Sequence, residues 1–162
     1  MLKILRLIIG HTVMLPFFLC FRIFSLFIGK QKSAAKVGKI LTKMAAIFLR
    51  LGIPSISDKG QFKAFKRKII RNFKLLFKPL YDVEVISESN GSVEFKILNC
   101  PFTSALKNLG AQELCKFACA GDFMVANRNK SKWKFSRTHS LGTDGVCCNH
   151  TYYSLDANDQ QT

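Results

Sequence analysis

The chain has 162 residues, and 48% of them are hydrophobic, which excludes a disordered protein. Six cysteines are too few for a small scaffold built on disulfides. Lysine and arginine outnumber aspartate and glutamate by 25 to 10, which excludes an acidic protein and favours an anionic partner. The excess lies in residues 1–78, which hold 17 of the cations and one acid, whereas residues 79–162 are close to neutral.

The first 30 residues are the most apolar part of the chain. Residues 7–21 carry no formal charge, and continuing through Arg22 to Gly29 gives a stretch long enough to cross a membrane. Against spanning, Arg22 is costly inside a bilayer and Pro16 kinks a helix. Three interpretations stay open: a helix inserted in or lying on a membrane, a packing helix, and a signal peptide.

Two basic amphipathic helices are predicted next. The first runs from Ser33 to Gly52, because glycine suits the position after a helix end. The second begins at the capping pair Asp58 and Gln61 and ends before Pro79. Their apolar and cationic faces fit an anionic lipid surface, or a packing helix with a solvated outer face. Nucleic acid is a weaker explanation, because the aromatic residues fall on the apolar faces, away from the cations.

The second half of the chain changes to the alternation typical of strands. Its predicted elements are strands at 81–86 and 93–98, helices at 102–109 and 111–127, and strands at 133–139 and 146–153. The sequence therefore predicts an α+β fold, with basic amphipathic helices first and then a β-β-α-α-β-β unit with a small antiparallel sheet. We divide it into a helical lead-in, 1–57, and an α+β domain with a cysteine-rich site, 58–162.

Cysteines with an acid neighbour are the first candidates for a functional site. Cys115, Cys119 and Asp122 recur at helical spacing and project from one helix face, and Cys100 ends a predicted strand. Such a group can bind a soft or borderline metal such as zinc, or provide a thiolate nucleophile. It can also be part of an inert core, because free cysteine is among the most buried residue types. The spacing leaves all three open.

The last two predicted strands add further candidates. Period two places Cys148 and His150 on one face of the final strand. Arg137 and Thr138 point to opposite faces of the strand before it. Arginine can hold a carboxylate with two hydrogen bonds, and a plain surface cation is the alternative interpretation.

In their order and spacing, these residues resemble the L-2-amino-thiazoline-4-carboxylic acid hydrolase family over about residues 80–155. The similarity is carried by Asn99-Cys100-Pro101-Phe102, Leu109-Gly110, Cys115 to Phe123, Arg137-Thr138, Leu141-Gly142 and Cys147. The resemblance implies hydrolysis of a cyclic thiazoline to N-carbamoyl-cysteine. In that reaction water adds to the amidine carbon between nitrogen and sulfur, and the ring thiolate leaves.

The resemblance also implies roles for the candidate residues. Asp122 is the expected base, or orients a metal-bound water, and Cys115 and Cys100 are the expected catalytic thiols. Arg137, supported by Thr138, is expected to bind the substrate carboxylate. Cys100, Cys115 and Cys119 are the expected ligands if the site holds zinc or another metal.

Two competing functions stay open beside the hydrolase. One is a non-catalytic, thiol-lined module that binds a ligand, metal or cluster at the membrane surface, and the other is a structural membrane adaptor. The expected partners are a small-molecule substrate with a carboxylate and an anionic membrane surface, and not nucleic acid. Unpaired cysteines and basic flanks predict a cytoplasmic protein, peripheral to the membrane or anchored in it.

Overall fold

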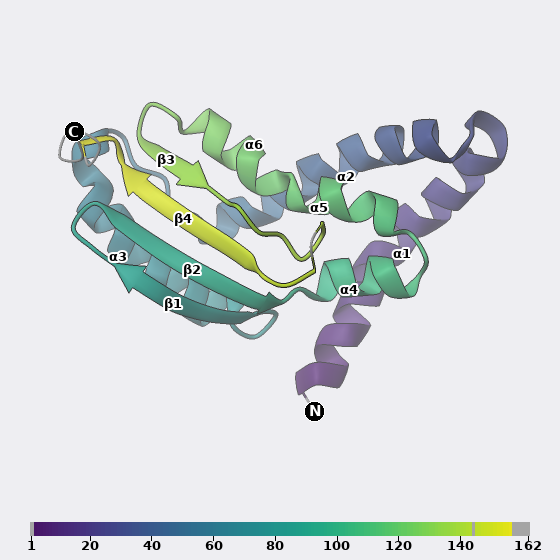
Figure 1. Cartoon of the computed structure of the whole chain (residues 1–162), viewed down its shortest axis with the longest axis horizontal. Coiled ribbons are helices and arrows are strands. Elements are labelled where there is room, and N and C mark those ends of the chain that lie inside the picture. Colours follow the sequence, from purple (N-terminus) through teal and green to yellow (C-terminus); the bar gives the residue numbers. More distant parts are fainter. Residues whose placement is uncertain (1, 144, 157–162) are drawn as a thin grey trace.

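The computed structural model describes residues 2–143 and 145–156, which form an α+β fold, as predicted. Helices α1 (Leu2–Ile28) and α2 (Lys30–Gly52) make a helical hairpin at one end of the molecule (Figure 1). Gly29 joins them with a φ of 79°, in the left-handed region that favours glycine. The predicted end of the second helix at Gly52 is confirmed.

The third helix is continuous but changes its winding. It starts as the 3-10 turn η1 (Lys59–Gln61), continues as α3 (Phe62–Asn72) and ends as the π-helical turn η2 (Phe73–Phe77). The capping pair meets side chain to side chain, because Gln61 Nε2 donates to Asp58 Oδ2 at 2.9 Å. At the other end, the Lys78 amide donates to the Phe73 carbonyl at 2.9 Å. Pro79 follows, as predicted, just beyond the helix.

The predicted strands and their antiparallel pairing are confirmed. The strands are β1 (Asp82–Glu88), β2 (Ser92–Asn99), β3 (Trp133–Ser136) and β4 (Cys148–Ser154), in the order β1-β2-β4-β3. β3 is shorter than predicted, because the chain leaves the sheet after Ser136. The sequence also predicts a turn at 142–145 between the last two strands, and residue 144 of that turn lies outside the described residues.

Between the strand pairs, the chain folds into short helices. They are α4 (Pro101–Asn108), the 3-10 turn η3 (Gln112–Leu114), α5 (Cys115–Cys119) and α6 (Gly121–Arg128). The single helix predicted over 111–127 is therefore wrong, since it is broken at Ala120. At the break, Gly121 packs so closely on α2 that an added Cβ would lie 2.8 Å from the Ala45 Cβ.

One face of the sheet is covered by α3, which lies behind the strands in Figure 1. Aromatic rings fill this layer. Phe65 stacks on Trp133 with ring centroids 5.3 Å apart, and Phe73 stacks on Phe95 at 4.4 Å. A second apolar cluster lies between α1, α2, α4 and the start of α5, and includes Phe21, Leu41, Leu106 and Cys115.

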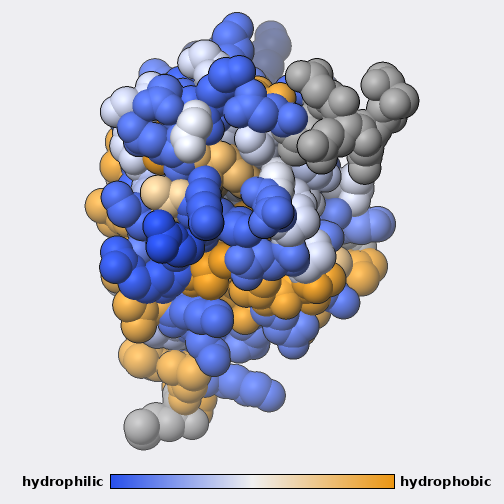
Figure 2. Space-filling view, turned by 90° about the vertical axis from the view of Figure 1, so that its left-hand side faces the viewer, coloured by the Kyte–Doolittle hydropathy of each residue, from blue (hydrophilic) through white to orange (hydrophobic). Residues whose placement is uncertain are grey.

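Helix α1 is long and apolar enough to cross a membrane by length and composition. Only 22% of its most apolar window is buried, and side chains such as Ile8 (56% exposed) and Leu26 (84%) face outward. Figure 2 shows apolar side chains at the N-terminal end of α1, at the bottom of the view. These features are compatible with a soluble protein and with a membrane-associated one.

The cationic faces of α2 and α3 point outward. Lys36, Lys39, Lys43 and Arg50 on α2, and Lys63, Arg67 and Arg71 on α3, are all exposed. Lys66 of α3 is an exception, because it is buried and its Nζ lies 3.1 Å from Glu88 Oε1. Arg6 of α1 is also buried, and its guanidinium pairs with Asp82 at 2.6 Å.

Candidate functional site

A cavity of about 310 Å³ lies among the α1–α2 hairpin, η2, α4 and the adjacent end of the sheet. Most of its lining is apolar. Thiol, carboxylate and imidazole side chains lie on its wall from β4, the junction of β2 with α4, and the α5–α6 segment: Cys100, Cys119, Asp122, Cys148 and His150. The cavity therefore combines an apolar compartment with one group of chemically reactive side chains.

Cys119 and Cys148 meet on this wall although they come from different elements. Cys119 is the last residue of α5 and Cys148 the first of β4. A hydrogen bond from the Cys148 thiol lowers the pKa of Cys119 to about 7, and the Ser140 side chain and the Arg137 charge act in the same direction. The same hydrogen bond, together with burial, raises the pKa of Cys148. Near neutral pH, Cys119 is therefore partly thiolate and Cys148 is the thiol that donates to it.

The two thiols predicted to be catalytic are in different surroundings. Cys100 lines the cavity, and burial raises its pKa to about 11. Cys115 lies in the second apolar cluster, where its thiol faces the Thr103 carbonyl at 3.7 Å, and burial raises its pKa to about 11. Cys115 does not line the cavity. Of these three cysteines, Cys119 has the environment that favours a thiolate.

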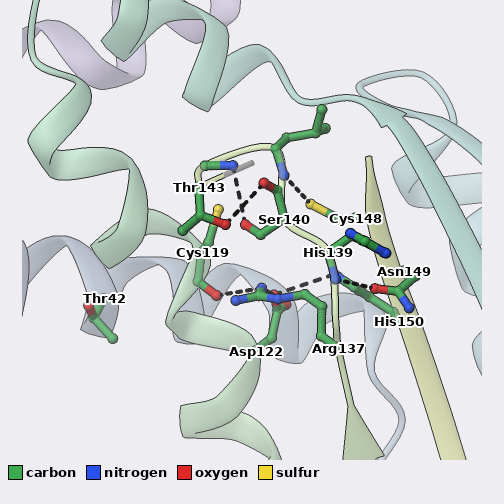
Figure 3. Close-up of polar contacts among 12 residues, drawn as sticks. Thr42, Cys119, Asp122, Arg137, His139, Ser140, Thr143, Cys148, Asn149 and His150 are labelled. Atoms are coloured by element: carbon green, nitrogen blue, oxygen red, sulfur yellow. Dashed lines mark hydrogen bonds and ion pairs between the residues drawn. The ribbon is translucent and has the colours of Figure 1, made fainter. Parts of the chain in front are cut away.

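Asp122 and Arg137 form a buried ion pair beside Cys119 (Figure 3). Their side chains are 8% and 9% exposed. The same Arg137 Nη1 donates to the Cys119 carbonyl at 2.8 Å, and the guanidinium lies over the Phe123 ring at 4.8 Å. Arg137 is therefore held against Asp122 and α5, and it is absent from the cavity lining.

His150 is a candidate functional residue to which the sequence gave a position on a strand face but no role. It is 4% exposed, lines the cavity, and its Nε2 lies 3.5 Å from Asp122 Oδ2. Among the described residues, neither ring nitrogen has a hydrogen-bond partner. Burial lowers the pKa of His150, an effect that Asp122 opposes, so the ring is neutral near pH 7. The available signal was its place on the same strand face as Cys148.

Thr138 lies away from this group. Its side chain is exposed, and its hydroxyl accepts a hydrogen bond from Asn149 Nδ2 at 2.8 Å. The Thr138 amide donates to Asn149 Oδ1 at 2.9 Å. The structure therefore gives Thr138 a role in fixing the segment that follows β3, and does not bring it to the cavity.

The predicted metal ligands do not come together. Within residues 2–143 and 145–156, no three His, Cys, Asp or Glu side chains are arranged to hold a metal ion. Cys115 does not line the cavity wall that carries Cys100 and Cys119. The three-thiol zinc site considered from the sequence thus does not fit this arrangement.

Comparison with known proteins identifies the family. The profile of the L-2-amino-thiazoline-4-carboxylic acid hydrolase family matches residues 8–152, from α1 to β4. No curated protein and no solved structure shows a significant match. The match is wider than the resemblance noted in the sequence, since it includes the helical hairpin that lines the cavity. The chain therefore belongs to the L-2-amino-thiazoline-4-carboxylic acid hydrolase family.

Proposed function

We propose that the protein is a hydrolase that opens a thiazoline-type cyclic amidine, with Cys119 as the nucleophile. The observation that carries the proposal is the position of Cys119 on the cavity wall, beside a thiol and a guanidinium that stabilise its thiolate. The family name supplies the reaction class. A thiolate is a strong nucleophile, and the carbon between nitrogen and sulfur in a thiazoline is electrophilic.

In the first step, the Cys119 sulfur forms a bond to that carbon and the bond from the carbon to the ring sulfur breaks. The departing ring sulfur takes up one proton. The product stays attached to Cys119 as an isothiourea that contains all the atoms of the substrate. Cys148 donates to Cys119 before the attack, so its thiol also lies beside the reacting centre.

In the second step, the oxygen of a water molecule adds to the same carbon while His150 accepts a proton from it. The bond to Cys119 then breaks and its sulfur leaves as a thiolate. One proton of the water ends on the former ring nitrogen, and the other replaces the proton used in the first step. A neutral imidazole is the form that this step requires, and burial favours that form.

Asp122 and Arg137 take positioning roles in this scheme. Asp122 lies between the guanidinium of Arg137 and the ring of His150, so it can orient the imidazole. Arg137 places a positive charge near Cys119 and holds the end of α5 through its carbonyl. These roles replace those expected from the resemblance, in which Asp122 is the base and Arg137 binds the substrate carboxylate.

The test is the release of free thiol from L-2-amino-thiazoline-4-carboxylate, measured with a thiol-reactive dye. We expect turnover by the wild type and by Cys20→Ser, whose site in α1 is exposed and does not line the cavity. Cys119→Ser is expected to lose at least about 100-fold of the rate, because an alcohol is a far weaker nucleophile near neutral pH. Full turnover by Cys119→Ser would contradict the proposal, and binding without turnover by the wild type would favour the non-catalytic module.

A further inference from the structure

We infer that the cavity binds the apolar chain of an amphiphilic substrate, whose reactive head lies at Cys119 and His150. The inference deepens the proposed function. It rests on that function only for the identity of the reactive end of the ligand. The evidence for a bound apolar chain does not depend on the proposed reaction, because it comes from the walls, the mouth and the charge of the cavity.

The walls contributed by the helices are hydrocarbon surfaces. Helix α1 contributes Ile9, Val13 and Phe17, and helix α2 contributes Leu41, Met44 and Phe48. Methionine side chains are flexible and adapt to ligands of varying shape. A ligand consisting only of a small polar ring would leave these surfaces without contacts, whereas a hydrocarbon chain removes them from water.

The charge of the lining argues in the same direction. Among the described residues that line the cavity there is no lysine or arginine. Two buried guanidinium groups lie near the lining, and both are already paired, Arg137 with Asp122 and Arg6 with Asp82. A free substrate carboxylate inside the cavity would therefore be unpaired and costly to bury, and it would face the negative charge of Asp122. A substrate whose carboxylate is masked by an ester or amide avoids that cost.

The mouth of the cavity lies at the helical hairpin. Val13 and Met44 line the cavity and yet are 43% and 51% exposed, whereas Ile97 and His150 on the sheet side are 6% and 4% exposed. The cavity is therefore open beside α1 and α2 and closed at the reactive end. Next to the mouth, Ile40 and Ile47 of α2 are also more than half exposed, which gives an entering chain a continuous apolar path.

Binding of an apolar chain can be measured directly with cis-parinaric acid, a fatty acid whose fluorescence rises in an apolar site. We expect the protein of residues 1–162 to bind cis-parinaric acid, and lauric acid to displace this probe. Val13→Trp, which narrows the mouth, should weaken binding at least about ten-fold, since several methylenes lose their contacts. Leu19→Trp is the matched control, because Leu19 is 49% exposed on the same helix but does not line the cavity.

A second competitor shows whether the bound apolar chain belongs to a fatty acid or to a phospholipid. Displacement by lauric acid alone indicates that the site takes an acyl chain with a small head. Displacement by lauroyl-lysophosphatidylcholine as well indicates a lipid whose head stays outside, and it would overturn the assignment of the head to Cys119 and His150. Absence of probe binding to the wild type, or equal binding by Val13→Trp and Leu19→Trp, would overturn the inference. Met44→Trp gives an independent test of the mouth if Val13→Trp does not fold.

The substrate preference separates this inference from the proposed function. We expect the octyl ester of L-2-amino-thiazoline-4-carboxylate to be opened with a kcat/KM at least about ten-fold above that of the free acid. Equal kcat/KM values with active enzyme would overturn the chain site and leave the hydrolase standing. Conversely, Cys119→Ser that binds cis-parinaric acid but opens neither compound would support both, and probe binding without any turnover by the wild type would overturn the hydrolase alone.

Discussion

Arg137 and Asp122 form an ion pair that is almost completely removed from solvent at the edge of the cavity. The pair joins the segment after β3 to helix α6, and through the Cys119 carbonyl it also holds the end of α5. One guanidinium thus holds together the segment after β3 and the two helices, α5 and α6, that carry Cys119 and Asp122. Breaking the pair leaves a buried charge without its partner, which costs far more than the loss of a surface pair.

We therefore expect Arg137→Met to lower the free energy of unfolding by about 3–5 kcal/mol. Lys30→Met is the control, because Lys30 pairs with Glu113 at a site where the lysine side chain is 61% exposed. Its expected loss is at most about 1 kcal/mol. Urea unfolding followed by circular dichroism measures both. Equal losses in the two variants would show that the buried pair does not hold the site together.

Reactivity of Cys119 should depend on pH in a characteristic way. Its pKa is lowered to about 7, so the thiolate fraction rises as the pH passes through 7 and is nearly complete at pH 8.5. In a Cys20→Ser background, we expect the rate of iodoacetamide labelling at Cys119 to rise from pH 5.5 and level off above pH 8. Cys100 and Cys115, whose pKa values are about 11, should label much more slowly across this range.

Peptide mapping assigns the labelled site, and Cys119→Ser in the same background gives the baseline. A labelling rate at Cys119 that keeps rising through pH 9, as for an ordinary thiol, would show that Cys148 and Arg137 do not stabilise its thiolate.

Gly142 leaves the space that the Cys119 side chain occupies. A Cβ at this position would lie 2.6 Å from Cys119 Sγ and 2.9 Å from the Cys115 carbonyl oxygen. We expect Gly142→Ala to displace Cys119 from Cys148, and so to raise the pH at which Cys119 labelling levels off. Gly60→Ala is the control, because its added Cβ meets only the flexible Asp58 side chain, at 3.1 Å. Identical labelling profiles in Gly142→Ala and Gly60→Ala would show that the Cys119 side chain does not lie against Gly142.

Membrane association remains our expectation for the hairpin and its cationic faces. Each exposed lysine or arginine near an anionic bilayer contributes about 1 kcal/mol to binding. Arg67→Glu with Arg71→Glu on α3 should therefore strongly reduce sedimentation with vesicles containing phosphatidylserine. Lys134→Glu on the exposed side of β3 should have a smaller effect. Equal loss in the two variants, or equal binding to neutral vesicles, would contradict an oriented anionic contact.

Local patterns predicted most elements of the fold. Alternation predicted the strands of the β1–β2 pair, and Gly52 and Pro79 predicted two helix ends. They could not predict the break at Ala120, because it follows from the close packing of Gly121 on α2. Contacts between segments distant in the sequence decide such features, and periodicity within one segment does not report them.

The site was predicted less completely for the same reason. Helical spacing placed Cys115, Cys119 and Asp122 on one face, but only Cys119 and Asp122 line the cavity, because Cys115 packs into the second apolar cluster. Cys119 gains its low pKa from Cys148, nearly thirty residues away, so no local motif distinguishes it from the other thiols. His150 shares a strand face with Cys148, but only the fold brings it to Asp122.

The most direct test of Cys119 as the nucleophile is the mass of the intact protein after reaction with the thiazoline. In His150→Asn, the second step lacks its base and the covalent intermediate should accumulate. We predict a mass gain equal to the whole substrate, since ring opening releases no fragment, and peptide mapping should place it on Cys119. An adduct on another residue would contradict covalent catalysis by Cys119. The same holds if His150→Asn shows no adduct while the wild-type protein turns over the substrate.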